Sequence, residues 1–187
     1  MRVIAGKFRS CPLRSLRGMD VRPTSDRLRE TLFNVLTAGN PDALLGSVWV
    51  DLFAGTGAVG IEALSRGAAQ VYFVESSKPA AEVIQENLRS LGIGEGFEIL
   101  RTDSVRAISD LGRRGIGSSH IFLDPPYAIR EAYGKTLNTL AKSAIAGNAV
   151  IIAEHDKRFD PGERFGSLTR LRKLLQGDAG LSFYQFR

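Results

Sequence analysis

Cysteine is almost absent from the sequence, since Cys11 is the only one among 187 residues. A single thiol cannot close an internal disulfide, and no second cysteine or histidine stands at metal-ligand spacing, so disulfide scaffolds and structural zinc sites are excluded. No apolar run reaches the roughly 18 residues that span a bilayer, and residues 1–7 lack the apolar core of a signal peptide. We therefore expect a cytoplasmic protein that stays where it is made.

Low-complexity tracts and internal repeats are also missing. The composition, 43% apolar and 24% charged, is that of an ordinary globular protein, which excludes disordered, collagen-like and coiled-coil chains. A chain of this length holds one domain, or one domain with a small appendage. We expect a basic extension of hairpin and helix over residues 1–40, a main domain over residues 41–187, and a monomer.

The excess positive charge is confined to one end of the chain. Residues 1–30 contain eight basic and three acidic residues, whereas the other 157 residues contain 17 of each, so the net charge of +5 lies in the first segment. This distribution predicts an arm that binds a polyanion, although a solvated basic tail would give the same pattern. The candidate contacts with such a polyanion, for example RNA, are Arg2, Lys7, Arg9, Arg14, Arg22 and Arg27.

The first segment has the signals of a short hairpin followed by a helix. Residues 1–5 and 12–16 are the two expected arms of the hairpin. After Pro23, either Thr24 or Ser25 can cap a helix. The apolar stripe of that helix consists of Leu28, Leu32, Val35 and Leu36.

Beyond residue 41, short apolar runs alternate with helical segments. The runs are residues 48–53, 71–74, 97–100, 121–123 and 149–153, and the helical signals cover residues 61–66, 79–91 and 104–111. This alternation predicts crossover units, and hence a mostly parallel sheet with helices on both faces. Residues 168–175 and 181–186, joined by the turn 177–180, predict an antiparallel hairpin at one edge.

The turn after the first strand carries a glycine pattern. Residues 54–60 read AGTGAVG, and glycines there let a ligand approach the backbone at the start of a helix. Glu75 ends the next strand, 20 residues after Gly55, where a carboxylate can accept both hydroxyls of a ribose. The glycine pattern and the acid occur together at the expected spacing, which predicts a site for an adenosine-containing cofactor. The alternative interpretation is a tight turn followed by an ordinary surface acid.

Two acids refine the choice of cofactor. Asp51 can face the cationic methionine end of S-adenosylmethionine, which favours this cofactor over a nicotinamide. Asp103 can accept from an adenine amino group, but it can equally cap a helix that starts at Ser104, so both roles stay open. The predicted cofactor contacts are Asp51, Phe53, Ala54, Gly55, Thr56, Gly57, Glu75, Asp103 and Ser104.

The fourth strand leads directly into Asp124-Pro125-Pro126-Tyr127. Two prolines fix the backbone and remove its N–H groups, which leaves carbonyls beside a carboxylate. Asp124 and the Pro125 carbonyl can hold both hydrogens of an exocyclic amine and direct its lone pair at a methyl donor. Tyr127 can stack on the base. These four residues, Asp124, Pro125, Pro126 and Tyr127, are the predicted catalytic set.

These motifs together resemble a known family. Residues 51–57 (DLFAGTG) with residues 124–127 (DPPY) look like class I methyltransferases that act on exocyclic amines. Residues 1–7 (MRVIAGK) followed by residues 22–34 (RPTSDRLRETLFN) are similar to the RsmD family, bacterial 16S ribosomal RNA guanine-N2 methyltransferases. The resemblance covers nearly the whole chain.

The resemblance implies a Rossmann-like seven-stranded sheet with a reversed last strand, S-adenosylmethionine as donor, and a guanine of the small-subunit RNA as acceptor. By position, it implies roles at the methionine part for Asp51, Gly55 and Gly57, at the ribose for Glu75, at the adenine for Asp103, and at the target base for residues 124–127. Residues 23–30 would cover the cofactor and contribute to the RNA face.

The chain departs from the family pattern at two places. Residues 175–179 read LQGDA where the family often has a Tyr-Gly-Asp-Thr run, which leaves open whether a base or RNA contact is made there. His120 stands where an acid is common, and we interpret it as structural. His155 has no partner visible in the sequence.

The implied mechanism is mainly the ordering of two reactants for in-line transfer. Asp124 or solvent could take the proton that the methylated amine loses. Three alternatives remain open from the sequence: transfer to N6 of adenine in DNA or RNA, a non-catalytic RNA-binding or assembly factor that keeps the cofactor fold, and a nicotinamide oxidoreductase.

Overall fold

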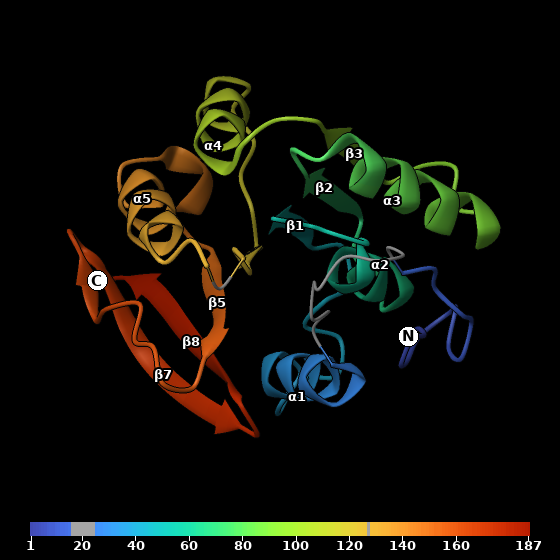
Figure 1. Ribbon diagram of the computed structural model, residues 1–187, viewed down its shortest axis with the longest axis horizontal. Helices are drawn as coiled ribbons and strands as arrows, with labels where there is room; N and C mark the ends of the chain where they lie inside the picture. Colours follow the sequence, from blue (N-terminus) through green and yellow to red (C-terminus); the bar gives the residue numbers. More distant parts are fainter. Residues whose placement is uncertain (16–24, 127) are drawn as a thin grey trace.

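The computed structural model describes residues 1–15, 25–126 and 128–187, and its centre is a single sheet (Figure 1). The strands are β1 (Val48–Leu52), β2 (Gln70–Val74), β3 (Phe97–Leu100), β4 (His120–Leu123), β5 (Val150–Asp156), β6 (Arg164–Phe165), β7 (Leu168–Gln176) and β8 (Ala179–Phe186). Within the described residues their order is β3-β2-β1-β4-β5-β8-β7-β6. Strands β1 to β5 pair in parallel, and β8, β7 and β6 pair antiparallel.

The predicted fold class is confirmed, with two differences at the C-terminal edge. The two-residue strand β6 pairs with β7 and adds an eighth strand to the seven expected. The turn between β7 and β8 is shorter than the predicted span of residues 177–180. Leu175 pairs with Gly180, and Gln176 pairs with Ala179, so only two residues connect the strands.

The helices are α1 (Asp26–Leu36), α2 (Ala58–Ser65), α3 (Lys78–Ser90), α4 (Ser104–Arg113) and α5 (Glu131–Leu140), with a short 3-10 helix η1 (Ala144–Ala146). Of the two possible caps for α1, Ser25 is the one that the structure describes. Its side chain accepts a hydrogen bond from the Leu28 N–H. Helix α2 begins three residues earlier than predicted because Gly57 already supplies its N-terminal cap position.

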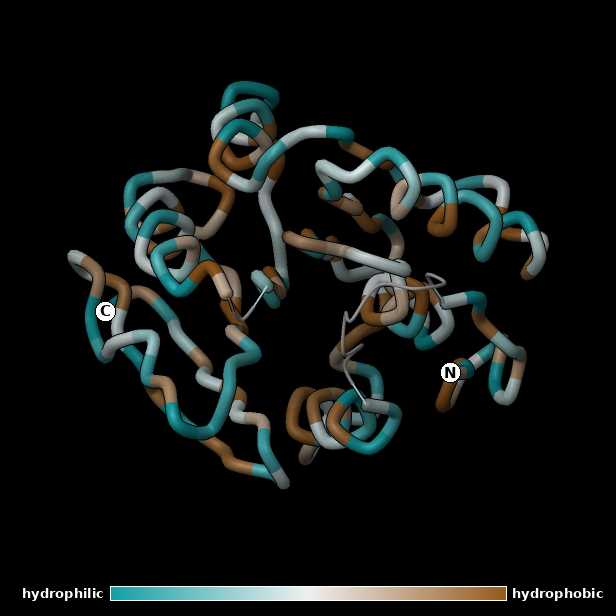
Figure 2. The backbone as a smooth tube through the Cα atoms, viewed as in Figure 1, coloured by the Kyte–Doolittle hydropathy of each residue, from teal (hydrophilic) through white to brown (hydrophobic). Residues whose placement is uncertain are grey.

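Helices cover both faces of the sheet. Side chains of α1, α2 and α3 pack in one apolar cluster, and those of α4 and α5 pack in a second. Figure 2 shows the central strands mostly brown and the outer turns of the helices largely teal, as burial of apolar residues requires. Among the described residues, no helix is both long enough and apolar enough to cross a membrane.

His120 packs against the first of these clusters. Its ring stacks on Trp49 with centroids 4.7 Å apart, and Trp49 stacks in turn on Phe33 at 5.3 Å. Burial lowers the pKa of His120 to about 4, so the imidazole is neutral near pH 7. This packing fits the structural role expected for His120.

The two arms of the predicted N-terminal hairpin do pair, over a short length. Arg2 and Pro12 form an isolated bridge, the Val3 N–H donates to the Cys11 carbonyl at 3.0 Å, and the Leu13 N–H donates to the Met1 carbonyl at 3.1 Å. The N–H groups of Ile4 and Ala5 donate to the carboxylate of Glu62 on α2, at 2.7 and 3.0 Å. The segment is therefore a short hairpin that also packs against α2. The end of its second arm, at residue 16, lies outside the described residues.

Candidate active site

Strands β1 and β4 lie side by side at the point where the strand order reverses. Strands β2 and β3 lie on one side of this pair and β5 on the other, so the loops after β1 and β4 lead to opposite faces of the sheet. In open α/β sheets, ligands bind at such a switch point, beyond the carboxyl ends of the strands. The two motifs singled out in the sequence meet there.

The glycine loop is held against β2. Phe53 has a φ of 66°, which is a strained value for a residue with a side chain, and Gly55 and Gly57 have φ values of 56° and 78°. The Ala54 N–H donates to the Val74 carbonyl at 2.9 Å. A Cβ on Gly60 would lie 2.3 Å from the ring of Phe73, so only glycine permits this approach of α2 to the sheet.

Asp51 is buried beneath this loop. One of its oxygens, Oδ2, accepts the Gly60 N–H at 3.0 Å, while Oδ1 is buried with no hydrogen-bond partner among the described residues. Burial raises the pKa of Asp51 to about 7; the Gly60 hydrogen bond opposes this shift, and the charge of Glu75 adds to it. An unsatisfied buried carboxylate oxygen is costly, and a cationic ligand such as an ammonium group would satisfy it.

Glu75 and Asp103 both make local hydrogen bonds. The carboxylate of Glu75 accepts the N–H of Gly55 at 2.9 Å and that of Ser77 at 2.8 Å, which ties the loop after β2 to the glycine loop. Asp103 caps α4, because its Oδ1 accepts the Arg106 N–H at 2.9 Å. The capping role left open by the sequence is therefore present, and the carboxyl of Asp103 is also exposed to solvent.

Ser104 is turned away from that solvent-facing edge. Its side chain is buried, and its hydroxyl lies 3.0 Å from that of Thr136 on α5. This contact joins α4 to α5. Any contact of Ser104 with a cofactor would therefore come from its backbone.

The second motif begins where β4 ends. Asp124 is half-buried, Pro125 is buried and Pro126 is exposed. The Pro126 carbonyl accepts the Ile129 N–H at 2.8 Å, whereas the Pro125 carbonyl receives no hydrogen bond from the described residues. The Pro125 carbonyl is thus the one left to accept from a ligand. Tyr127, the last residue of the motif, lies outside the described residues.

A neighbouring acid was not singled out in the sequence. Leu123 pairs with Ala153, which brings Asp124 level with Glu154 on the adjacent strand β5. Glu154 is buried. Desolvation of the Asp124 carboxyl raises the pKa of Asp124 well above its usual value, and the nearby charges of Glu154 and Asp51 raise it further. The available signal was its position, since Glu154 follows the apolar run 149–153 as Asp124 follows the run 121–123.

The predicted RNA contacts differ in how freely they face solvent. Arg2, Lys7, Arg9 and Arg27 are exposed. Arg14 is exposed but pairs with Glu86 at 2.8 Å. Arg22 lies outside the described residues.

Arg29 corrects the charge argument. It is one of the eight basic residues in the first 30, yet its side chain is fully buried. It pairs with Asp26 at 2.9 Å and lies 3.7 Å from Glu62, so it cannot face a polyanion. The basic surface of the arm is accordingly smaller than the sequence suggested.

The arm is attached to the cofactor loop itself. The amide nitrogen of the buried Asn87 donates to the carbonyls of Arg14 and Thr56, at 3.2 and 3.0 Å. The Arg14 N–H donates back to the Asn87 amide oxygen at 2.8 Å. One side chain of α3 thus joins the basic arm to the turn between Gly55 and Gly57.

The structure places two further features of the C-terminal part of the chain. The segment 175–179 is the tip of the β7–β8 hairpin, where Leu175 is exposed. His155 does have partners: Nε2 lies 3.0 Å from the Ser182 hydroxyl on β8, and Nδ1 lies 2.9 Å from the Asp156 carbonyl. The second contact is local, whereas the first requires the pairing of β5 with β8.

Several known proteins resemble this chain. YlbH of Bacillus subtilis (strain 168), named as a candidate rRNA methyltransferase, is 35% identical over 189 residues and is covered completely, as is this chain. "Ribosomal RNA small subunit methyltransferase D" of Escherichia coli (strain K12) is 35% identical over 157 residues, which are 83% of this chain and 75% of that protein.

Solved structures give the same result for the fold. That of yhhF from Escherichia coli, named as a candidate methyltransferase, has a TM-score of 0.84 and 27% identity, covering 100% of this chain and 98% of that one. SMU.776, a methyltransferase candidate complexed with SAH, shares the fold alone, at a TM-score of 0.65 and 15% identity over 84% of this chain and 48% of that one. The family model described as "Conserved hypothetical protein 95" matches residues 1–185. The chain belongs to this family, the RsmD family, and has its Rossmann-like methyltransferase fold.

Proposed function

We propose that the protein transfers a methyl group from S-adenosylmethionine to the exocyclic N2 amine of a guanine in 16S ribosomal RNA of the small subunit. The observation that carries the proposal is the juxtaposition of Asp51, with its unpartnered Oδ1, and Asp124 at one switch point of the sheet. A cationic donor and an amine acceptor each have a carboxyl group there. The names of the relatives support the choice of ribosomal RNA.

The residues present fit the cofactor. The ammonium of its methionine part would satisfy Oδ1 of Asp51, and the left-handed glycines leave room for it at the start of α2. The carboxylate of Glu75 would accept hydrogen bonds from the ribose hydroxyls in place of the one it now accepts from the Gly55 N–H. Asp103 would accept a hydrogen bond from the adenine amine. When bound, S-adenosylmethionine supplies a methyl group on a sulfonium sulfur.

Asp124 and the Pro125 carbonyl would orient the guanine amine. Accepting both N2 hydrogens would direct the nitrogen lone pair at the methyl group that S-adenosylmethionine supplies. The methylated amine would then lose one proton, with S-adenosylhomocysteine as the leaving group. The raised pKa of Asp124 makes its carboxylate a suitable acceptor for that proton. Ordering of this kind supplies about 7–11 kcal/mol. The sequence expectation that Tyr127 stacks on the base is part of the proposal.

The exposed residues of the arm would hold the RNA backbone. Arg2, Lys7, Arg9 and Arg27 face solvent, and through Asn87 the arm is fixed to the glycine loop. Residues 1–40 would therefore act as an RNA-binding extension of the main domain, residues 41–187. Each phosphate contact adds about 0.9 to the salt slope on a duplex and about 0.7 on a single strand.

Labelled S-adenosylmethionine tests the proposal directly. The protein is incubated with 30S subunits that lack the modification, with free 16S RNA and with duplex DNA, and the nucleosides are separated by chromatography. Label in N2-methylguanosine is the expected result. Label in N6-methyladenine would replace the target base, and no label despite tight cofactor binding would favour a non-catalytic RNA-binding factor.

The role of Asp124 has its own test. Asp124→Ala should lower methyl transfer by about 10²- to 10⁴-fold while leaving the affinity for S-adenosylhomocysteine unchanged. Asp42→Ala, at an exposed acid remote from the site, is the matched control. Loss of cofactor binding in Asp124→Ala would show that Asp124 holds the donor and not the acceptor.

A further inference from the structure

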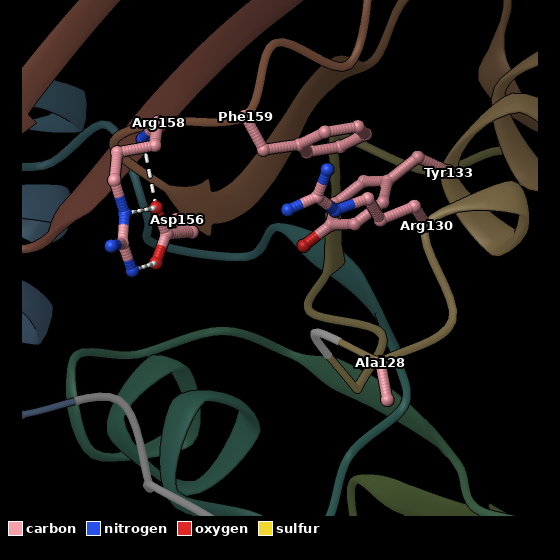
Figure 3. Close-up of a pocket in the computed structure, with 6 residues that line it drawn as sticks. All are labelled: Ala128, Arg130, Tyr133, Asp156, Arg158 and Phe159. Atoms are coloured by element: carbon pink, nitrogen blue, oxygen red, sulfur yellow. Dashed lines mark hydrogen bonds and ion pairs between the residues drawn. The ribbon is translucent and has the colours of Figure 1, made fainter.

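A pocket of about 370 Å³ lies beside the proposed target-base site (Figure 3). It is lined by Ala128, Arg130, Tyr133, Asp156, Arg158 and Phe159. Ala128 belongs to the loop that starts at Asp124, and Asp156 ends β5. The pocket thus opens at the carboxyl ends of β4 and β5, the same edge of the sheet as the methyl-transfer site, and the transfer itself uses none of its side chains.

One wall of the pocket is an aromatic surface. The rings of Phe159 and Tyr133 have centroids 5.0 Å apart, and the Tyr133 hydroxyl donates to the backbone carbonyl of Glu154 at 2.7 Å. The guanidinium carbon of Arg130 lies 5.3 Å from the centroid of Phe159. Figure 3 shows Arg130 lying against the Phe159 ring. A flat ring and a flat cation, held together, form a surface on which a nucleobase can stack.

The pocket also carries an excess positive charge. Arg158 binds Asp156 through two contacts, at 3.2 and 3.3 Å, and these bonds hold the pKa of Asp156 near 2, so the carboxylate is ionised at neutral pH. The charge of Arg130 also contributes to the lowered pKa of Asp156, but no salt bridge joins the two side chains in the part of the chain that the structure describes, so two guanidinium groups face a single carboxylate. One positive charge therefore remains available to an anion such as a phosphate.

We propose that this pocket is a second nucleotide subsite, which holds the RNA nucleotide adjacent to the methylated guanine. The base stacks on Phe159, and its phosphate lies at the guanidinium groups of Arg130 and Arg158. This inference rests on the proposed function, because it takes the target base to lie at Asp124.

The order of the strands supports this position. Glu75 follows β2 and Asp51 lies on β1, on the cofactor side, while Asp124 follows β4 and the pocket lies beyond it towards β5. A guanine held at Asp124 therefore has the cofactor on one side and the Phe159 surface on the other. Extruding a base from its stack costs a few kcal/mol, and stacking of the neighbouring nucleotide offsets part of that cost.

RNA binding in the presence of S-adenosylhomocysteine tests the subsite without relying on methyl transfer. Phe159→Leu keeps apolar volume but removes the ring, and should weaken binding of free 16S RNA by about 5- to 150-fold. Phe159→Tyr keeps an aromatic ring and should bind this RNA as tightly as the wild-type protein does. Arg130→Gln should lower the salt slope by about 0.7–0.9. Arg113→Gln, at an exposed arginine in the last turn of α4, should change neither quantity. Thermal melting confirms that each variant is folded.

The outcomes separate this inference from the proposed function. Wild-type protein that binds RNA without forming N2-methylguanosine would refute the target base, and the Phe159 and Arg130 variants would still decide the subsite by binding. Unchanged RNA binding in both variants overturns the subsite. A defect on assembled 30S subunits that is absent on free 16S RNA also overturns it, because the pocket would then contact a ribosomal protein.

Discussion

Replacing Glu62 by glutamine tests the buried charges that fix the N-terminal segment to α2. The carboxylate accepts the N–H groups of Ile4 and Ala5, binds the Nε of Arg66 at 2.7 Å and lies 3.7 Å from the Nε of Arg29. The side chains of Glu62 and Arg29 are both fully buried. Removing the negative charge leaves a guanidinium in the interior with fewer partners.

The size of the effect follows from these contacts. Breaking a buried ion pair by removing one charge costs about 3–5 kcal/mol. Asp26, 2.9 Å from Arg29, remains as a partner, and the glutamine oxygen can still accept one backbone N–H, which places the expected cost of Glu62→Gln at the lower end, about 3 kcal/mol. For a protein of this size, that corresponds to a fall of about 6–12 °C in Tm.

Urea denaturation followed by circular dichroism measures this loss, and hydrogen exchange locates it. The amides of Ile4 and Ala5 should exchange faster in Glu62→Gln. Glu98→Gln is the matched control, because Glu98 pairs with Arg114 at 2.6 Å with both side chains more than one third exposed, and such pairs contribute about 0–1 kcal/mol. Equal losses in the two variants, or unchanged protection at Ile4 and Ala5, would refute the reasoning.

Three further predictions concern the site and its supports. Because the pKa of Asp51 is raised in the folded protein, its carboxyl keeps a proton between about pH 4 and 7 that the unfolded chain has already lost. The free energy of unfolding of the cofactor-free protein should therefore fall as pH rises through this range, and Asp51→Asn should reduce this pH dependence in urea titrations. Affinity for S-adenosylhomocysteine should rise towards the upper end of that range, and calorimetry that finds no pH dependence would contradict the pairing. Gly60→Ala should cost about 1–3 kcal/mol, since its Cβ would meet Phe73, whereas Gly134→Ala, with open space at its Cβ, should gain about 0.5–1 kcal/mol in the same titrations. Ser25→Ala should cost about 1 kcal/mol by thermal melting, and an unchanged Tm would show that the α1 cap is dispensable.

The sequence alone determined the parts of the molecule that depend on local order. Alternating apolar runs and helical stripes predicted β1 to β5 and the helices α1 to α4, because each element needs only its own periodicity and caps. Helix α5, between β4 and β5, was not among the predicted helices. The glycine loop and Asp124 followed from the same principle, since ligands bind where parallel strands end. Even the hairpin of β7 and β8 was visible in its turn residues.

Contacts between distant residues were decided only by the tertiary structure. Arg29 looked like part of a basic arm, but a carboxylate 33 positions later and the packing of α1 buried it. Glu154 became a neighbour of Asp124 only through the register of β4 and β5, and the Phe159 pocket only through the meeting of two loops. Burial, pKa shifts and pockets depend on which segments pack together, and local sequence patterns do not encode those partners.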